Sequence, residues 1–136
     1  MKIDITLIGY ITTFENITKT NVKDCFFNKN KNLVFIVKEE QGKRAVGKNG
    51  VNIRRLERLL HKKIKVIEFN NNPEEFVKNI IFPLKSPEIK LNEKELVIKT
   101  DSTQLKALLL GREKSNLNEL QSIVKKYFPD IKIIIY

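Results

Sequence analysis

Cysteine, histidine and long apolar runs are all scarce in this 136-residue chain. The single cysteine, Cys25, has no partner for an internal disulfide, and the single histidine, His61, cannot supply the ligands of a conventional zinc site. We therefore expect Cys25 to be a small core residue, His61 to lie at a helix end, and no metal or other cofactor to be bound.

Apolar stretches are short throughout. No run approaches the roughly eighteen apolar residues that a membrane helix needs, and the N-terminus lacks the basic, apolar and small-residue regions of a secretory signal. We expect a cytoplasmic protein without membrane contact. The length fits one ordinary domain or two very small ones, and 41% hydrophobic residues are enough to build a core.

Acidic residues are in deficit: 16 Asp and Glu stand against 26 Lys and Arg, giving a net charge of +10. This excess favours nucleic acid or another anionic partner, although the many lysines, asparagines and isoleucines could also reflect an AT-rich genome. The charge is uneven, however: residues 1–72 carry fifteen basic and seven acidic side chains, and residues 73–136 carry eleven and nine. A genome-wide bias would not divide the two halves in this way.

Residues 41–63 hold the densest charge, with eight lysines and arginines and one acid. Gly47 and Gly50 bracket a short turn there, because glycine adopts backbone angles that other residues avoid and leaves room for a ligand. The helix that follows is expected to bury one apolar face, formed by Ile53, Leu56, Leu59 and Leu60. Its other face is basic and comprises Arg54, Arg55, Arg58 and Lys62. The free amides at the helix start suit a phosphate beside Lys48.

The remaining pattern predicts two series of elements in the same order. Helices are expected at residues 3–17, 42–46 and 51–60, and strands at 22–27, 33–38 and 64–69, although a strand at the very start remains open. In the second half, helices are expected from Pro73, at residues 103–110 and through Leu117 to Tyr127. Strands are expected there at residues 88–91, 95–99 and 131–136.

The two halves therefore form an internal repeat. At an offset of 64 residues Gly47 falls on Gly111, and Leu56 falls on Leu120. We expect an α+β protein with two domains, residues 1–72 and 73–136. The short, proline-containing segment 84–87 is expected to join the repeats and to hold them in one orientation.

A G-x-x-G loop between two helices, carried on a three-stranded sheet, resembles a type II KH module. Two such modules in tandem resemble the NusA transcription factors, and the small size and residues 43–57 are most similar to the compact archaeal NusA-like proteins. The resemblance implies two tandem type II KH domains, each a three-stranded sheet with helices on one face. It also implies a protein that binds single-stranded nascent RNA in transcription elongation or termination, with RNA polymerase as a further candidate partner. We expect the protein to be a monomer.

The resemblance also assigns residues. The RNA clamp would be Gly47, Lys48, Asn49 and Gly50, and the neighbouring RNA contacts would be Lys43, Arg44, Arg54, Arg55 and Arg58. In the second module a weaker site would comprise Gly111, Arg112 and Lys114, and Lys114 occupies the place of the second glycine. We expect Lys114 to crowd an approaching backbone, and the first module to carry most of the affinity.

Other interpretations remain open at this point. A lone G-x-x-G can be only a turn, and a basic stripe can be only solvated surface. An RNA-binding role in ribosome assembly or RNA maturation is the main alternative, since such modules serve several processes. The acids near the loop, Glu39, Glu40 and Glu57, show no paired placement, metal ligands or nucleophile, so we expect no enzyme.

Overall fold

The computed structural model describes residues 5–136 and divides the chain into two compact units, Met1–Phe69 and Asn70–Tyr136. The expectation that residues 84–87 join the repeats is wrong. They lie within the second unit, between helix α4 (Pro73–Ile81) and strand β4 (Glu88–Asn92). The second unit begins earlier because its first element is α4, whose start is capped by the Asn72 side chain, 2.9 Å from the backbone nitrogen of Glu74.

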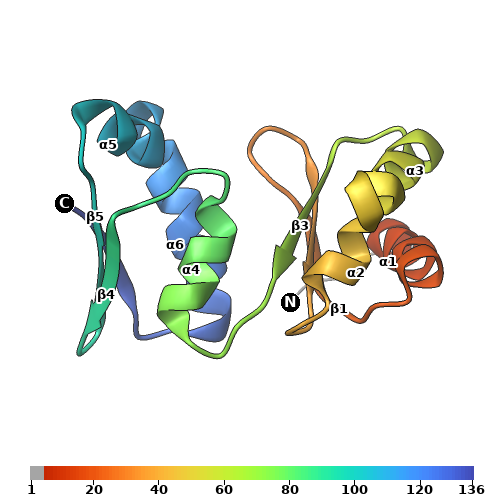
Figure 1. Ribbon diagram of the computed structural model, residues 1–136, viewed down its shortest axis with the longest axis horizontal. Helices are drawn as coiled ribbons and strands as arrows, with labels where there is room; N and C mark the ends of the chain where they lie inside the picture. The colour runs from red at the N-terminus through yellow and green to blue at the C-terminus, as the bar shows by residue number, and fades with distance from the viewer. Residues whose placement is uncertain (1–4) are drawn as a thin grey trace. The chain divides into compact units, whose positions relative to one another are not determined.

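The first unit is a three-stranded sheet with its helices on one face (Figure 1). Its elements are α1 (Ile5–Thr18), β1 (Val22–Phe27), β2 (Leu33–Val37), α2 (Gly42–Val46), α3 (Val51–Leu60) and β3 (Ile64–Glu68). Strand β2 is central, antiparallel to β1 and parallel to β3. A parallel neighbour needs a crossover connection, and this crossover is formed by α2, the glycine loop and α3.

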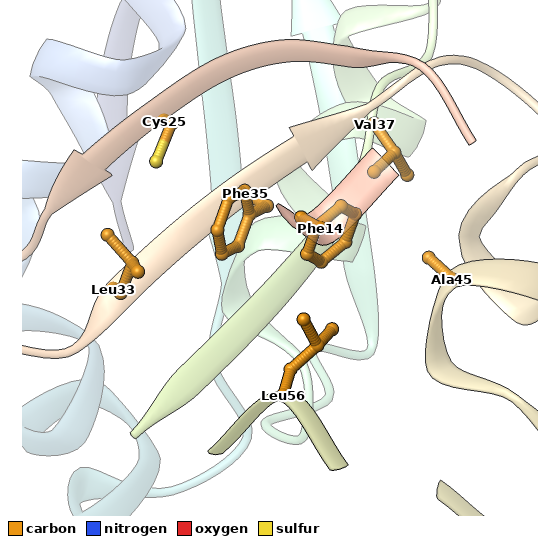
Figure 2. Close-up of a cluster of buried hydrophobic side chains, with 7 residues drawn as sticks. All are labelled: Phe14, Cys25, Leu33, Phe35, Val37, Ala45 and Leu56. Atoms are coloured by element: carbon orange, nitrogen blue, oxygen red, sulfur yellow. The ribbon is translucent and has the colours of Figure 1, made fainter. Parts of the chain in front are cut away.

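The core of the first unit lies between the sheet and the three helices. All five residues of β2 are buried, as expected for an apolar run in the centre of a sheet. Figure 2 shows the buried cluster, which comprises Phe14, Cys25, Leu33, Phe35, Val37, Ala45 and Leu56. The rings of Phe14 and Phe35 stack with centroids 4.0 Å apart. Cys25 is therefore the small core residue that the sequence predicts.

The second unit repeats this topology. Its further elements are β5 (Glu95–Lys99), α5 (Thr103–Leu110), α6 (Ser115–Tyr127) and β6 (Lys132–Ile135). Strand β5 is central, antiparallel to β4 and parallel to β6. Phe76 of α4 is fully buried, and its ring meets that of Tyr127 edge-on at 5.6 Å. The observed helices and strands confirm the predicted ones to within one or two residues in most cases. An initial strand was left open over residues 3–6: Ile5 and Thr6 lie in α1, and residues 3 and 4 lie outside the described part.

The predicted apolar face of α3 is wider than the buried one. Leu59 is 54% exposed, whereas its counterpart in the repeat, Ile123, is 5% exposed. At 3.6 residues per turn Leu59 stands about 60° around the helix from the fully buried Leu56, and Leu60 stands on the opposite flank. Leu60 packs against the core and Leu59 does not, so α3 buries only one flank of its apolar stripe.

Candidate nucleic-acid interface

Helix α2 is fixed at both ends before the glycine loop begins. The backbone N–H of Gly42 donates to the Glu68 carboxylate at 3.0 Å, which ties the helix start to β3. A Cβ at Gly42 would lie 2.6 Å from a Glu68 oxygen, so a side chain there would have to displace the carboxylate that holds the helix start. Ala45, one turn later, is fully buried in the core. The loop therefore starts from a rigid support.

Gly47 turns the chain away from α2. Its dihedral angles, φ 80° and ψ 166°, lie in a region open essentially to glycine alone. A Cβ on Gly47 would also lie 2.9 Å from the side-chain Cγ of Asn52. That side chain closes the turn, because its amide nitrogen donates to the carbonyl oxygen of Arg44 at 3.0 Å.

Asn52 is a positioning residue that the sequence analysis missed. The repeat held the signal: at an offset of 64 residues Asn52 falls on Asn116, whose amide nitrogen donates to the carbonyl oxygen of Leu108 at 2.7 Å. Asn116 lies even closer to Gly111, where a Cβ would come 2.6 Å from its Cγ. One asparagine thus closes each loop in the same way.

The exposed tip of the loop consists of Lys48 and Asn49. Asn49 and Gly50 both have left-handed backbone angles, with φ of 57° and 76°. The guanidinium of Arg54 donates to the carbonyl oxygen of Asn49, so one predicted RNA contact also stabilises the loop. The outcome is a turn with a lysine and an amide at its tip and glycines on both sides.

The other predicted cations surround this loop on the two helices. Lys43, Arg44, Arg54, Arg55 and Arg58 are all exposed, as is Lys48. Among the described residues none of these six forms a salt bridge with an acid. Arg54 and Arg58 line a shallow, open groove along α3, and Arg55 is outside that lining. The site is therefore a surface of uncompensated positive charge, which suits a polyanion.

The acids that could serve an enzymatic site are engaged or dispersed. Glu57 is one of the residues that line this groove, but its carboxylate accepts the backbone N–H of Ile64 at 3.0 Å and so joins α3 to β3. In the part of the chain that the structure describes, no three His, Cys, Asp or Glu side chains are grouped as metal ligands.

No helix in residues 5–136 is long and apolar enough to cross a membrane. His61 caps the end of α3 in a left-handed conformation, φ 54° and ψ 41°.

The second loop has the same backbone as the first. Gly111 has φ 71° and ψ 176°, and Glu113 has φ 54°, close to the angles of Gly47 and Asn49. Lys114, in place of the second glycine, keeps a left-handed φ of 62°. The loss of that glycine therefore leaves the turn intact, and the two loops differ in the side chains that they present.

The chain is similar to known proteins in sequence and in structure. The KH domain family matches residues 9–99, a range that includes the whole Gly47–Gly50 loop and both flanking helices. A protein of Methanocaldococcus jannaschii described as "Probable transcription termination protein NusA" is 26% identical over 137 aligned positions, which cover 97% of this chain and 73% of that protein. A protein of Methanococcus vannielii with the same description is 29% identical over 126 positions, covering 90% and 72%.

A solved structure is also similar to this chain over nearly its whole length. The structure titled "Crystal structure of APE1850" matches with a TM-score of 0.74 and 29% identity, over 98% of this chain and all of that one. The sequence match and the two helix-flanked loops lead to one conclusion: the chain belongs to the KH domain family and is an archaeal NusA-like protein.

Proposed function

We propose that the chain comprises two tandem type II KH domains, residues 1–72 and 73–136, and that the first clamps single-stranded nascent RNA during transcription elongation or termination. The observation that carries this proposal is the Gly47–Gly50 loop, with its unpaired cations on both flanking helices. The order of elements in each unit and the description of the relatives as probable NusA proteins support it.

The clamp would act through backbone geometry and charge together. Gly47 and Gly50 bear no side chains, so a sugar-phosphate backbone can lie directly against the turn, with Lys48 beside a phosphate. Lys43 and Arg44 would add charge from α2. Val51 follows the loop and is 49% exposed, which offers an apolar surface for a base.

The second unit would hold RNA more weakly. Gly111, Arg112 and Lys114 form its candidate site, but Glu113 stands at the loop tip where the first unit has Asn49. The Glu113 carboxylate would repel a phosphate. Lys114 also adds a side chain at the position where Gly50 leaves the backbone of the first loop uncovered. We therefore propose that this unit contributes little affinity.

The proposal places the protein in the cytoplasm as a monomeric, non-enzymatic RNA-binding factor that acts with RNA polymerase. Affinity purification of the tagged protein separates this role from ribosome assembly or RNA maturation. RNA polymerase subunits should be recovered under conditions that preserve nascent transcripts. Recovery of ribosomal subunits or their precursors without polymerase would contradict the transcription role.

Salt dependence tests the binding character directly. If four to six cations reach phosphates, the logarithm of affinity should fall with the logarithm of salt concentration at a slope of roughly −3 to −4, because each phosphate contact on a single strand contributes about 0.7. Fluorescence anisotropy with single-stranded RNA across a salt series gives this slope. A nearly flat slope, or tighter binding to duplex DNA, would refute the clamp.

A further inference from the structure

The basic groove continues past the predicted site to the far end of α3. Its lining comprises Arg54, Glu57, Arg58, His61, Lys62 and Lys63. Arg54 is also bonded to the Asn49 carbonyl, so the groove begins at the loop tip. The ten residues of α3 span about 15 Å at 1.5 Å per residue. One surface therefore leads from the G-x-x-G loop to Lys62 and Lys63, which the family resemblance does not assign.

The charge of this groove is uncompensated. Arg58, Lys62 and Lys63 are exposed, and none of them forms a salt bridge with any residue in the described part of the chain. Glu57 is the only acid in the lining, and its carboxylate is held by the Ile64 N–H. Three cations without a salt bridge therefore line one groove and are available for phosphates of a strand.

An exposed aromatic ring, that of Phe27, lies near Lys62, one of the residues that line the groove. Phe27 ends β1 and pairs with Leu33, which in turn pairs with Ile64, so Phe27 lies at the same end of the sheet as the start of β3, with β2 between them. Phe27 is 45% exposed, and the Lys62 ammonium lies 5.8 Å from its ring centroid. That distance is near the outer limit of a cation–π contact, so Lys62 can leave the ring at little cost.

We propose that RNA held at the Gly47–Gly50 loop continues along α3, with phosphates contacting Arg58, Lys62 and Lys63 and a base stacked on Phe27. This inference rests on the proposed clamp function and deepens it. An exposed aromatic ring next to a groove of cations without salt bridges suits a single-stranded nucleic acid, whereas an acidic protein would need the charge alone. A stacked strand rises about 3.4 Å per nucleotide, so the 15 Å path adds about four nucleotides to the four of the clamp.

The second unit lacks this extension, which provides a control within the chain. The residue in the same sheet position as Phe27 is Asn92, since each pairs with the first residue of the central strand. At an offset of 64 residues, Ser122 stands in place of Arg58. The extended path is therefore specific to the first unit.

The test measures how a variant at the far end of the path changes the affinity for a short and for a longer RNA. Mixed-sequence single-stranded RNAs of four and ten nucleotides are titrated against the full chain and against Phe27→Leu, which keeps an apolar side chain but removes the ring. Loss of one stacked base should weaken binding of the ten-nucleotide RNA about fivefold or more and leave the four-nucleotide RNA unchanged. Equal losses on both lengths, with unfolding unaltered, would overturn the path.

Charge is tested in parallel. Lys62→Gln/Lys63→Gln should reduce the salt slope for the ten-nucleotide RNA by about 1.4, because two phosphate contacts are lost. The control, Lys125→Gln/Lys132→Gln, removes two exposed lysines of the second unit and should leave the slope nearly unchanged. An equal effect of both pairs, or tighter binding of polyglutamate than of the ten-nucleotide RNA, would overturn the inference.

Different results would refute the proposed clamp and the proposed extension. If Lys48→Asp weakens both RNA lengths while the variants at Phe27 and at Lys62/Lys63 do nothing, the clamp stands and the extension is wrong. If Lys48→Asp has no effect on either length, the proposed function itself is wrong.

Discussion

Replacing Gly47 by alanine should lower the free energy of unfolding of the first unit much more than replacing Gly50 by alanine. Gly47 has φ 80° and ψ 166°, a conformation that costs other residues about 1–3 kcal/mol. The added Cβ would also meet the backbone nitrogen of Asn52 at 3.0 Å and its Cγ at 2.9 Å. Because a backbone atom in the first turn of α3 cannot move aside easily, we expect a total loss of about 3 kcal/mol in the free energy of unfolding.

Gly50 is the matched control three residues later. Its angles, φ 76° and ψ 18°, are left-handed helical, which costs alanine about 1–2 kcal/mol. Among the described residues, its only neighbour within 4 Å would be the Arg54 guanidinium, 3.2 Å from the new Cβ, which is a side-chain group and can shift more easily than backbone. Alanine also reduces the entropy of the unfolded chain, which returns about 0.4–1 kcal/mol. The net loss should be about 1 kcal/mol, and Lys114 shows that the corresponding position in the second unit accepts a side chain.

Urea unfolding followed by amide NMR signals distinguishes the two glycines. The Phe35 amide in β2 reports on the first unit, and the Ile98 amide in β5 provides an internal reference in the second. The midpoint for Phe35 should fall much further in Gly47→Ala than in Gly50→Ala, while the Ile98 midpoint stays constant. Equal losses in the two variants would refute the argument that the first glycine is required by the backbone and the second is not.

Two further pairs of variants test the packing around the loop. Asn52→Ala should destabilise the first unit by about 1 kcal/mol and weaken RNA binding, since the Arg44 carbonyl loses its hydrogen-bond partner. Asn116→Ala should destabilise the second unit but leave RNA affinity nearly unchanged. Both are measured by unfolding and RNA titration, and an equal loss of affinity would count against the asymmetry between the units. Leu56→Ala should cost about 2–5 kcal/mol and Leu59→Ala less than about 0.5 kcal/mol in chemical denaturation, because the first is fully buried and the second is 54% exposed.

The fold was accessible from the sequence because its local signals agree with one another. Apolar periodicity marks the helices, β-branched runs mark the strands, and caps such as Ser102, whose hydroxyl accepts the Leu105 N–H at 3.0 Å, mark the helix starts. The repeat reinforced each assignment, since an element in one half predicts its partner in the other. The sequence also located the loop, because a pair of glycines in a basic segment ahead of a helix is typical of a phosphate-binding turn.

Other features depend on tertiary contacts that periodicity does not encode. Leu59 has the spacing of a core residue, but packing of α3 covers only the Leu60 flank. Glu57 looks like a free acid near the site and instead bonds the N–H of Ile64. Arg54 was assigned to RNA alone, although its guanidinium also holds the Asn49 carbonyl. In each case the partner is set by the three-dimensional position of a neighbouring backbone group.

The position of the second glycine illustrates a different limit. Sequence reasoning treats Lys114 as a departure from the motif, whereas the structure shows an unchanged left-handed turn. The two glycines are not equivalent: the first adopts angles that only glycine tolerates, and the second adopts angles that other residues reach at modest cost. The motif alone does not reveal this difference.

The most direct test of the central claim compares acids at the tips of the two loops. Lys48→Asp/Asn49→Asp places two acids on the first loop, and aspartate tolerates the left-handed angle of Asn49. Arg112→Asp likewise gives the second loop two adjacent acids, because Glu113 is already present at the next position. With RNA affinity measured at one salt concentration and thermal unfolding as the check on folding, the first variant should nearly abolish binding and the second should weaken it only slightly. If both variants stay folded and lose affinity equally, the first loop is not the principal RNA clamp.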